Sequence, residues 1–88
     1  IERDHAVDCR VLALDLCAPD AVARLDALTA DLDIGLVVAA AGFGSLGPLL
    51  AQSPEEERRM LRLNAEATLE IALRFGPRLR ARGRGGLV

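Results

Sequence analysis

One apolar run, residues 34–44 with the sequence IGLVVAAAGFG, constrains the fold of this chain more than any other stretch. The run is too short to span a membrane, and its β-branched residues and bounding glycines favour a buried strand over a helix. A strand that is apolar on both faces belongs in a sheet covered on both sides, as parallel sheets are. The run therefore predicts a parallel α/β fold.

Small residues stand where this predicted strand ends. Ala39, Ala40, Ala41 and Gly42 place almost no side chain at its carboxyl end. Ligands of open α/β sheets bind outside this edge, so the pattern is compatible with a binding site. A tight connection whose small residues serve only packing is the alternative, and the small-residue pattern alone favours it.

A second apolar run, residues 9–16 with the sequence CRVLALDL, also has the length of a strand. Its last polar residue, Asp15, could face the ligand edge of the sheet or begin a turn, and the sequence leaves both open. From Pro19 onward apolar residues recur at helical spacing as far as Leu32. The order strand, helix, strand predicts a βαβ unit with a right-handed crossover.

A long helix is predicted over residues 54–81. Ser53 is a capping residue, Pro54 suits the first helical position, and acidic residues fill the first turn. The apolar side chains expected to face inward are Met60, Leu61, Leu63, Ala67, Ile71, Leu73 and Phe75. Beyond the helix, residues 87–88 are expected to open a third strand.

Asn64 lies on the inward stripe of this helix and requires an explanation, because a buried amide needs hydrogen-bond partners. Thr68 one turn further on, or a neighbouring loop, could satisfy the amide. The functional alternative is a polar group, or a local opening of the helix that frees a backbone carbonyl, at a site. The helical periodicity favours the first explanation.

Composition and charge limit the classes of function. Hydrophobic residues make up 51% of the chain and charged residues 27%, which indicates a globular protein. A net charge of -2 gives no overall attraction to nucleic acid or to anionic lipid. With neither a signal pattern nor an apolar stretch of spanning length, we expect a cytoplasmic protein that does not bind membranes.

A basic cluster near the C-terminus is the one feature that suggests nucleic-acid binding. It consists of Arg74, Arg78, Arg80, Arg82 and Arg84. Cations near a helix C-terminus usually form a solvated face, and the chain has only two aromatic residues with which to stack bases. We therefore expect no nucleic-acid partner.

Four motifs in sequence order resemble the middle of a short-chain dehydrogenase/reductase domain, from about residue 10 to residue 88. Asp15-Leu16 stands where that family has the acid and the apolar residue that meet adenine, and residues 39–42 stand at its Asn-Asn-Ala-Gly motif. Asn64, within LRLNAEA, stands at the Asn of the catalytic set, and ARGRGGLV resembles the entry to the fifth strand. The resemblance implies that residues 1–88 are a partial βαβαβ segment of one NAD(P)-binding domain, a Rossmann-like, doubly wound parallel sheet.

For the complete chain the resemblance implies an oxidoreductase that transfers a hydride between NAD or NADP and a small-molecule carbonyl or alcohol substrate. Asp15 and Leu16 would bound the adenine pocket. At the ribose, the close approach of the backbone would depend on Ala40, Ala41 and Gly42.

The resemblance also implies a catalytic residue and an assembly. Asn64 would act through its backbone carbonyl and hold a water of the proton relay. Subunits would pair into a homodimer or homotetramer through the helix at residues 54–81.

The sequence departs from the family pattern in two ways. Ala39 and Ala40 replace both asparagines of the Asn-Asn-Ala-Gly motif, and the 88 residues contain no Tyr or Lys for catalysis. These departures keep open a nucleotide-binding or structural α/β protein of the same fold without catalysis. A nucleic-acid binder that uses the arginine cluster is a third hypothesis, which the near-neutral charge disfavours.

Overall fold

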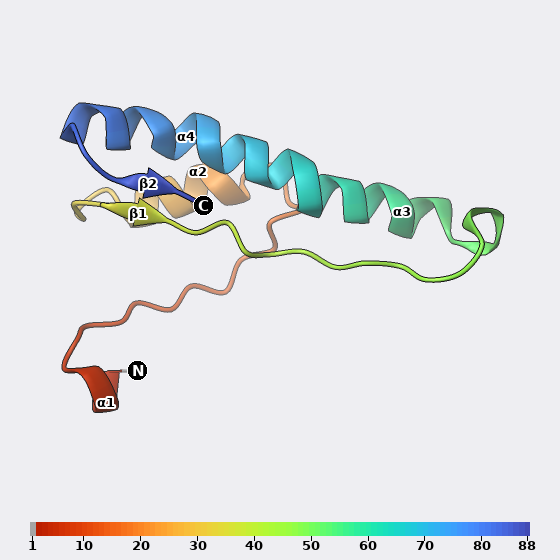
Figure 1. Ribbon diagram of the computed structural model, residues 1–88, viewed down its shortest axis with the longest axis horizontal. Helices are drawn as coiled ribbons and strands as arrows, with labels where there is room; N and C mark the ends of the chain where they lie inside the picture. Colours follow the sequence, from red (N-terminus) through yellow and green to blue (C-terminus); the bar gives the residue numbers. More distant parts are fainter. Residues whose placement is uncertain (1) are drawn as a thin grey trace.

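The computed structural model describes residues 2–88, and Figure 1 shows their arrangement. The elements in chain order are α1 (Glu2–His5), α2 (Ala21–Leu28), β1 (Leu36–Val37), the 3₁₀ turn η1 (Leu49–Ala51), α3 (Pro54–Leu61), the π-helical turn η2 (Arg62–Glu66), α4 (Ala67–Arg82) and β2 (Gly86–Leu87). α3, η2 and α4 form one continuous rod, and the sheet and α2 lie beside its C-terminal half (Figure 1). None of the described helices is long and apolar enough to cross a bilayer.

The sheet is parallel, as the sequence predicts. β1 pairs with β2, with Leu36 opposite Gly86 and Val37 opposite Leu87. The Ala39 amide also donates to the carbonyl oxygen of Val88 at 2.8 Å, so the ladder continues one step past the assigned strands. The prediction of a strand opening at residues 87–88 is therefore confirmed.

The strand predicted over residues 34–44 is much shorter than expected. Only Leu36 and Val37 are assigned to it, and the chain then runs on extended as far as the turn before η1. Strand pairing needs a neighbour along the edge, and the hydrogen bonds between these two segments end at Ala39. The apolar pattern correctly indicated an extended, sheet-forming segment but not how much of it is paired.

The strand predicted over residues 9–16 is not a strand in the described part of the chain. The segment is not assigned to the sheet and does not pair with β1, so the predicted βαβ unit lacks its first strand. Its side chains nevertheless alternate: Leu12, Leu14 and Leu16 are half-buried, whereas Val11 is 90% exposed. The period of two that fits a sheet is thus present without a hydrogen-bonded neighbour.

α2 is shorter than the sequence pattern suggested. It begins at Ala21, with Asp20 at the N-cap, and ends at Leu28 instead of near Leu32. Arg78 of α4 donates to the carbonyl oxygens of Thr29 and Leu32 at 2.8 and 3.0 Å, so these carbonyls are satisfied outside a regular helix.

The long helix begins where predicted and ends one residue later. The Ser53 hydroxyl accepts a hydrogen bond from the Glu56 amide at 3.4 Å. Ser53 is therefore the N-cap of the helix, and Pro54 takes its first position. At the other end Arg82 is the last helical residue, and Gly83 closes the helix in the left-handed conformation at φ 81°. The helical rod therefore spans the length expected of a helix that covers one face of a sheet.

The buried core lies between α2, α4 and one face of the sheet. Val22, Ile71 and Phe75 form its centre, and Leu25, Val37 and Ala39 pack against them. Burial of Ala67, Ile71 and Phe75 is as predicted. The inward orientation predicted for Leu61 and Leu73 is wrong, because these side chains are 66% and 68% exposed on the rod.

The opposite face of the sheet is open in the described part of the chain. Leu36 and Val38 are 60% and 59% exposed, whereas Val37 and Ala39 point toward the core. The expectation of cover on both faces is therefore met on one face only. Both α2 and α4 cover the face to which Val37 and Ala39 point. The residues that follow β1 therefore reach the end of a sheet whose second face, with Leu36 and Val38, is open.

Candidate functional site

The segment that follows β1 is clamped to the middle of the long helix. The Phe43 amide donates to Asn64 Oδ1 at 3.0 Å, and Asn64 Nδ2 donates to the Phe43 carbonyl oxygen at 2.7 Å. Together these two bonds satisfy the backbone donor and acceptor of Phe43 with one side-chain amide. Asn64 is exposed, so the prediction of a buried amide is wrong, and the neighbouring loop is the partner of its side chain.

The helix opens at the same residue. η2 (Arg62–Glu66) is a π-helical turn centred on Asn64, and its geometry includes a bond from the Ala67 amide to the carbonyl oxygen of Arg62, five residues back. A π-turn shifts the hydrogen-bond ladder by one residue and loosens the carbonyls inside it. The opening of the helix, which sequence reasoning ranked second, is therefore present together with the satisfied amide.

The carbonyl of Asn64 points to a hydroxyl. Thr68 Oγ1 donates to the Asn64 carbonyl oxygen at 3.4 Å. Thr68 is one of the two partners that the sequence offers for the Asn64 side chain, but it contacts the main chain instead. The side chain and the backbone of Asn64 thus have different partners, one on the loop and one on the helix.

Gly42 is required by the clamp. A Cβ atom built on Gly42 would lie 2.8 Å from Asn64 Oδ1, closer than real Cβ contacts allow. Two residues further on, a Cβ on Gly44 would meet nothing within 4 Å. The glycine of the small-residue motif therefore allows the close approach of the Asn64 side chain.

A cavity of about 270 Å³ brings several predicted site residues together at the end of β1. Leu16, Ala40 and Ala41 line it together with Leu63 and Thr68 of the helical rod. Among the described residues that line the cavity, Thr68 alone has a polar side chain. Leu16 and the alanines, far apart in sequence, thus line the same cavity.

Asp15 begins a turn. Its Oδ1 accepts a hydrogen bond from the Cys17 amide at 2.9 Å, and its carbonyl oxygen accepts one from the Ala18 amide at 2.9 Å. This geometry supports the turn interpretation of Asp15. The side chain remains exposed beside the cavity, so its predicted role at an adenine ring stays a prediction.

Arginines of the long helix lie against this turn. A hydrogen bond with Cys17 is the main cause that raises the pKa of Arg59, and the charge of Asp15 adds to it. Arg62 Nη1 donates to the carbonyl oxygen of Cys17 at 3.3 Å. No spacing in the sequence indicated this contact, because it depends on how residues 15–17 fold back on the rod.

Three arginines of the basic cluster at the C-terminal end of the rod form ion pairs within the chain. Arg78 and Arg82 pair with Asp26 and Asp33 at 2.8 and 3.0 Å, and Arg74 lies 3.7 Å from Asp26. These arginines therefore fasten α2 and its following turn to α4. Three of the five arginines of the cluster are therefore engaged by acidic side chains of the same chain.

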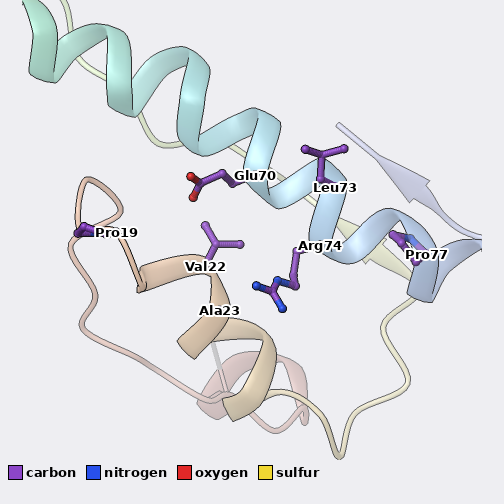
Figure 2. A pocket seen from close by; sticks show the side chains of 7 residues that line it. All are labelled: Pro19, Val22, Ala23, Glu70, Leu73, Arg74 and Pro77. Atoms are coloured by element: carbon purple, nitrogen blue, oxygen red, sulfur yellow. The ribbon is translucent and has the colours of Figure 1, made fainter.

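A groove of about 520 Å³ lies between α2 and α4 (Figure 2). In Figure 2 Val22 and Ala23 of α2 face Glu70 and Arg74 of α4 across it, and further lining residues are Pro19, Leu73 and Pro77. None of the residues predicted for the site lines this groove. It is separate from the cavity at the end of β1.

Comparison with known proteins gives structural relatives only. No protein-family model and no curated protein matches the chain. A short-chain dehydrogenase from Sphingobium yanoikuyae, solved with NADPH, is similar over 98% of this chain, with 28% identity and a TM-score of 0.87. The bulky-bulky ketone specific alcohol dehydrogenase from Comamonas testosteroni matches 98% of this chain with 25% identity and a TM-score of 0.87.

A third structure agrees in fold. L-Sorbose reductase from Gluconobacter frateurii, solved with NADPH and L-sorbose, has 24% identity and a TM-score of 0.86 over 98% of this chain. The chain spans only about a third of each of these proteins, 34% or 35% of their length. In fold, the chain is therefore similar to about a third of a short-chain dehydrogenase/reductase domain.

Proposed function

We propose that the complete protein is an NAD(P)-dependent oxidoreductase of the short-chain dehydrogenase/reductase type, acting on a carbonyl or alcohol substrate. The observation that carries the proposal is the clamp between Asn64 and Phe43 next to a π-turn, at the carboxyl end of a parallel strand. Ligands of open α/β sheets lie at this edge. A packing role alone does not require the helix to open at the same residue.

The small residues after β1 fit a dinucleotide. Ala40, Ala41 and Gly42 are all exposed at this edge, so a ligand can approach the backbone there. Leu16 shares a cavity with the two alanines, and exposed Asp15 stands beside it. We propose that these five residues hold the adenosine half of NAD or NADP. The bound cofactor would supply the hydride chemistry.

Asn64 would serve the reaction through its main chain. Both polar atoms of its side chain are engaged by Phe43, so the side chain is a brace for the strand end. The backbone carbonyl lies in the π-turn, where one lone pair can accept a hydrogen bond from water. We propose that this carbonyl orients a water of the proton relay.

We further propose that residues 1–88 belong to one NAD(P)-binding domain and that its subunits pair through the long helix. Leu61, Leu69 and Leu73 are each more than half exposed on the rod, at spacings of eight and four residues. Such a stripe suits the pairing of two helices in a homodimer or homotetramer.

A non-catalytic nucleotide-binding protein is the second candidate. The observation that favours it is the replacement of two amide side chains by Ala39 and Ala40 at the end of β1. Backbone contacts to a nucleotide can persist without these side chains, but polar groups that support catalysis are lost. Nucleotide binding without turnover of any carbonyl or alcohol would identify this case.

The test uses the full-length protein, titrated with NADH and with NADPH by fluorescence and then assayed against a panel of ketones and alcohols. Gly42→Ala is expected to weaken turnover about tenfold, because the added Cβ displaces Asn64 Oδ1 and breaks the clamp. Gly44→Ala is the matched control, since a Cβ there meets nothing within 4 Å. Absence of nucleotide binding, or equal effects of the two substitutions, would contradict the proposal.

A further inference from the structure

The Asn64 carbonyl is held by a second residue of the same helix. Thr68 Oγ1 donates to this carbonyl oxygen at 3.4 Å, one turn beyond the clamp on the loop. Asn64 is therefore fixed at two points, by Phe43 through its side chain and by Thr68 through its backbone. Neither contact belongs to the regular hydrogen-bond ladder of the rod.

The hydroxyl of Thr68 lies among apolar side chains. Its side chain lines the cavity at the end of β1, where the neighbouring walls are formed by alanines and leucines. A hydroxyl can donate one hydrogen bond and accept two, so it can hold the carbonyl and a water at once. Ala39 and Ala40, which also line the cavity, offer no such groups.

We propose that Thr68 is a positioning residue, whose hydroxyl fixes the direction of the Asn64 carbonyl oxygen in the π-turn. The inference rests on the proposed function, because the carbonyl matters only where it orients a water during turnover. π-turns are rare within α-helices and are frequent at functional sites. Without the hydroxyl, the carbonyl is free to turn back toward the amides of its own helix.

The same kind of bond occurs elsewhere in the chain without a π-turn. At the end of α2, Thr29 Oγ1 donates to the Leu25 carbonyl oxygen at 2.8 Å, also four residues back. Threonine hydroxyls often bond to such carbonyls in helices. Thr29 does not line the cavity at the end of β1, and its hydroxyl also contacts Asp26 and Arg78, so Thr29 provides an internal control for loss of a packing hydroxyl.

The experiment compares Thr68→Val, Thr68→Ser and Thr29→Val in the full-length protein. Valine keeps the shape of threonine but has no hydroxyl, and serine keeps the hydroxyl. Thr68→Val is expected to lower kcat about fivefold with the KM for the nucleotide unchanged, and Thr68→Ser to restore it. Thr29→Val is expected to lower the denaturation midpoint and leave kcat unchanged.

A second readout does not depend on turnover. The ¹³C chemical shift of the Asn64 carbonyl in the nucleotide-free protein is expected to move upfield in Thr68→Val and to stay in place in Thr68→Ser and Thr29→Val. An unmoved shift in Thr68→Val would overturn the bond, and a moved shift with unchanged kcat would overturn the positioning role. Wild-type protein without any turnover would overturn the proposed function, and the positioning role with it, while the carbonyl shift would still report the bond.

Discussion

Arg78 is the side chain on which the packing of α2 against α4 most depends. Its guanidinium donates to Asp26 Oδ1 at 2.8 Å and to the carbonyl oxygens of Thr29 and Leu32 at 2.8 and 3.0 Å. It also lies over the ring of Phe75, 5.2 Å from the centroid. The planar fork of the Arg78 guanidinium thus binds the C-terminal end of α2 and also contacts the core.

The expected cost of Arg78→Ala follows from these contacts. A hydrogen bond to a charged group contributes about 1.5–3 kcal/mol net, but contributions from one guanidinium do not add. The Arg78 and Asp26 side chains are 24% and 27% exposed, so water replaces part of what is lost. We expect the free energy of unfolding to fall by about 2–3 kcal/mol.

Urea denaturation of the full-length protein, followed by circular dichroism, measures this loss. Arg80→Ala is the matched control, because Arg80 is an exposed arginine two positions further along α4, and its change should stay within about 0.5 kcal/mol. Arg78→Lys should lie between the two, since an ammonium keeps the charge but loses the fork. If Arg78→Ala and Arg80→Ala were equally mild, the reasoning about the fork would be refuted.

Two further predictions concern the sheet entry and the N-terminal segment. Gly85→Ala should destabilise the protein by about 1–3 kcal/mol in the same denaturation assay. Gly85 has φ 139°, and a Cβ there would lie 2.6 Å from the carbonyl oxygen of Gly35. An unchanged denaturation midpoint would contradict this prediction. Hydrogen bonding to Arg10 lowers the pKa of Asp31 below its usual 3.8, so the pair stabilises the fold at neutral pH and this contribution is lost as the pH falls through the lowered pKa. NMR titration of the Asp31 carboxyl should show its midpoint rising in Arg10→Gln, and an unmoved midpoint would exclude the ion pair.

The sequence predicts helices better than strands in this chain. Ser53 and Pro54 mark the start of the long helix correctly, because capping is decided by a few adjacent residues. The inward face was only partly right: Ile71 and Phe75 are buried, but Leu73 is 68% exposed. A leucine in a broad apolar stripe can lie on either border of it, and only the position of α2 decides which border is covered.

The candidate site was predictable in part for a similar reason. Local patterns marked Gly42 and Asn64 as unusual positions, but their contact joins residues 22 apart and depends on the path of the loop between them. Likewise, Thr68 was an evident neighbour of Asn64 at helical spacing. Whether it meets the side chain or the backbone depends on the π-turn, for which the sequence has no clear signal.

The unpaired segment at residues 9–16 shows what a hydrophobic period can and cannot report. The sequence predicted a strand there from an apolar run, and the alternation seen in the structure turns one face toward α2, since Leu12 and Leu25 line a common cavity. The period reports which face is buried but is silent on which strand lies alongside. In a doubly wound sheet of order 3-2-1-4-5-6, the third and fourth strands are separated by the first two, although a helix joins them directly. If residues 9–16 and β1 take these two places, their lack of pairing is what the topology requires.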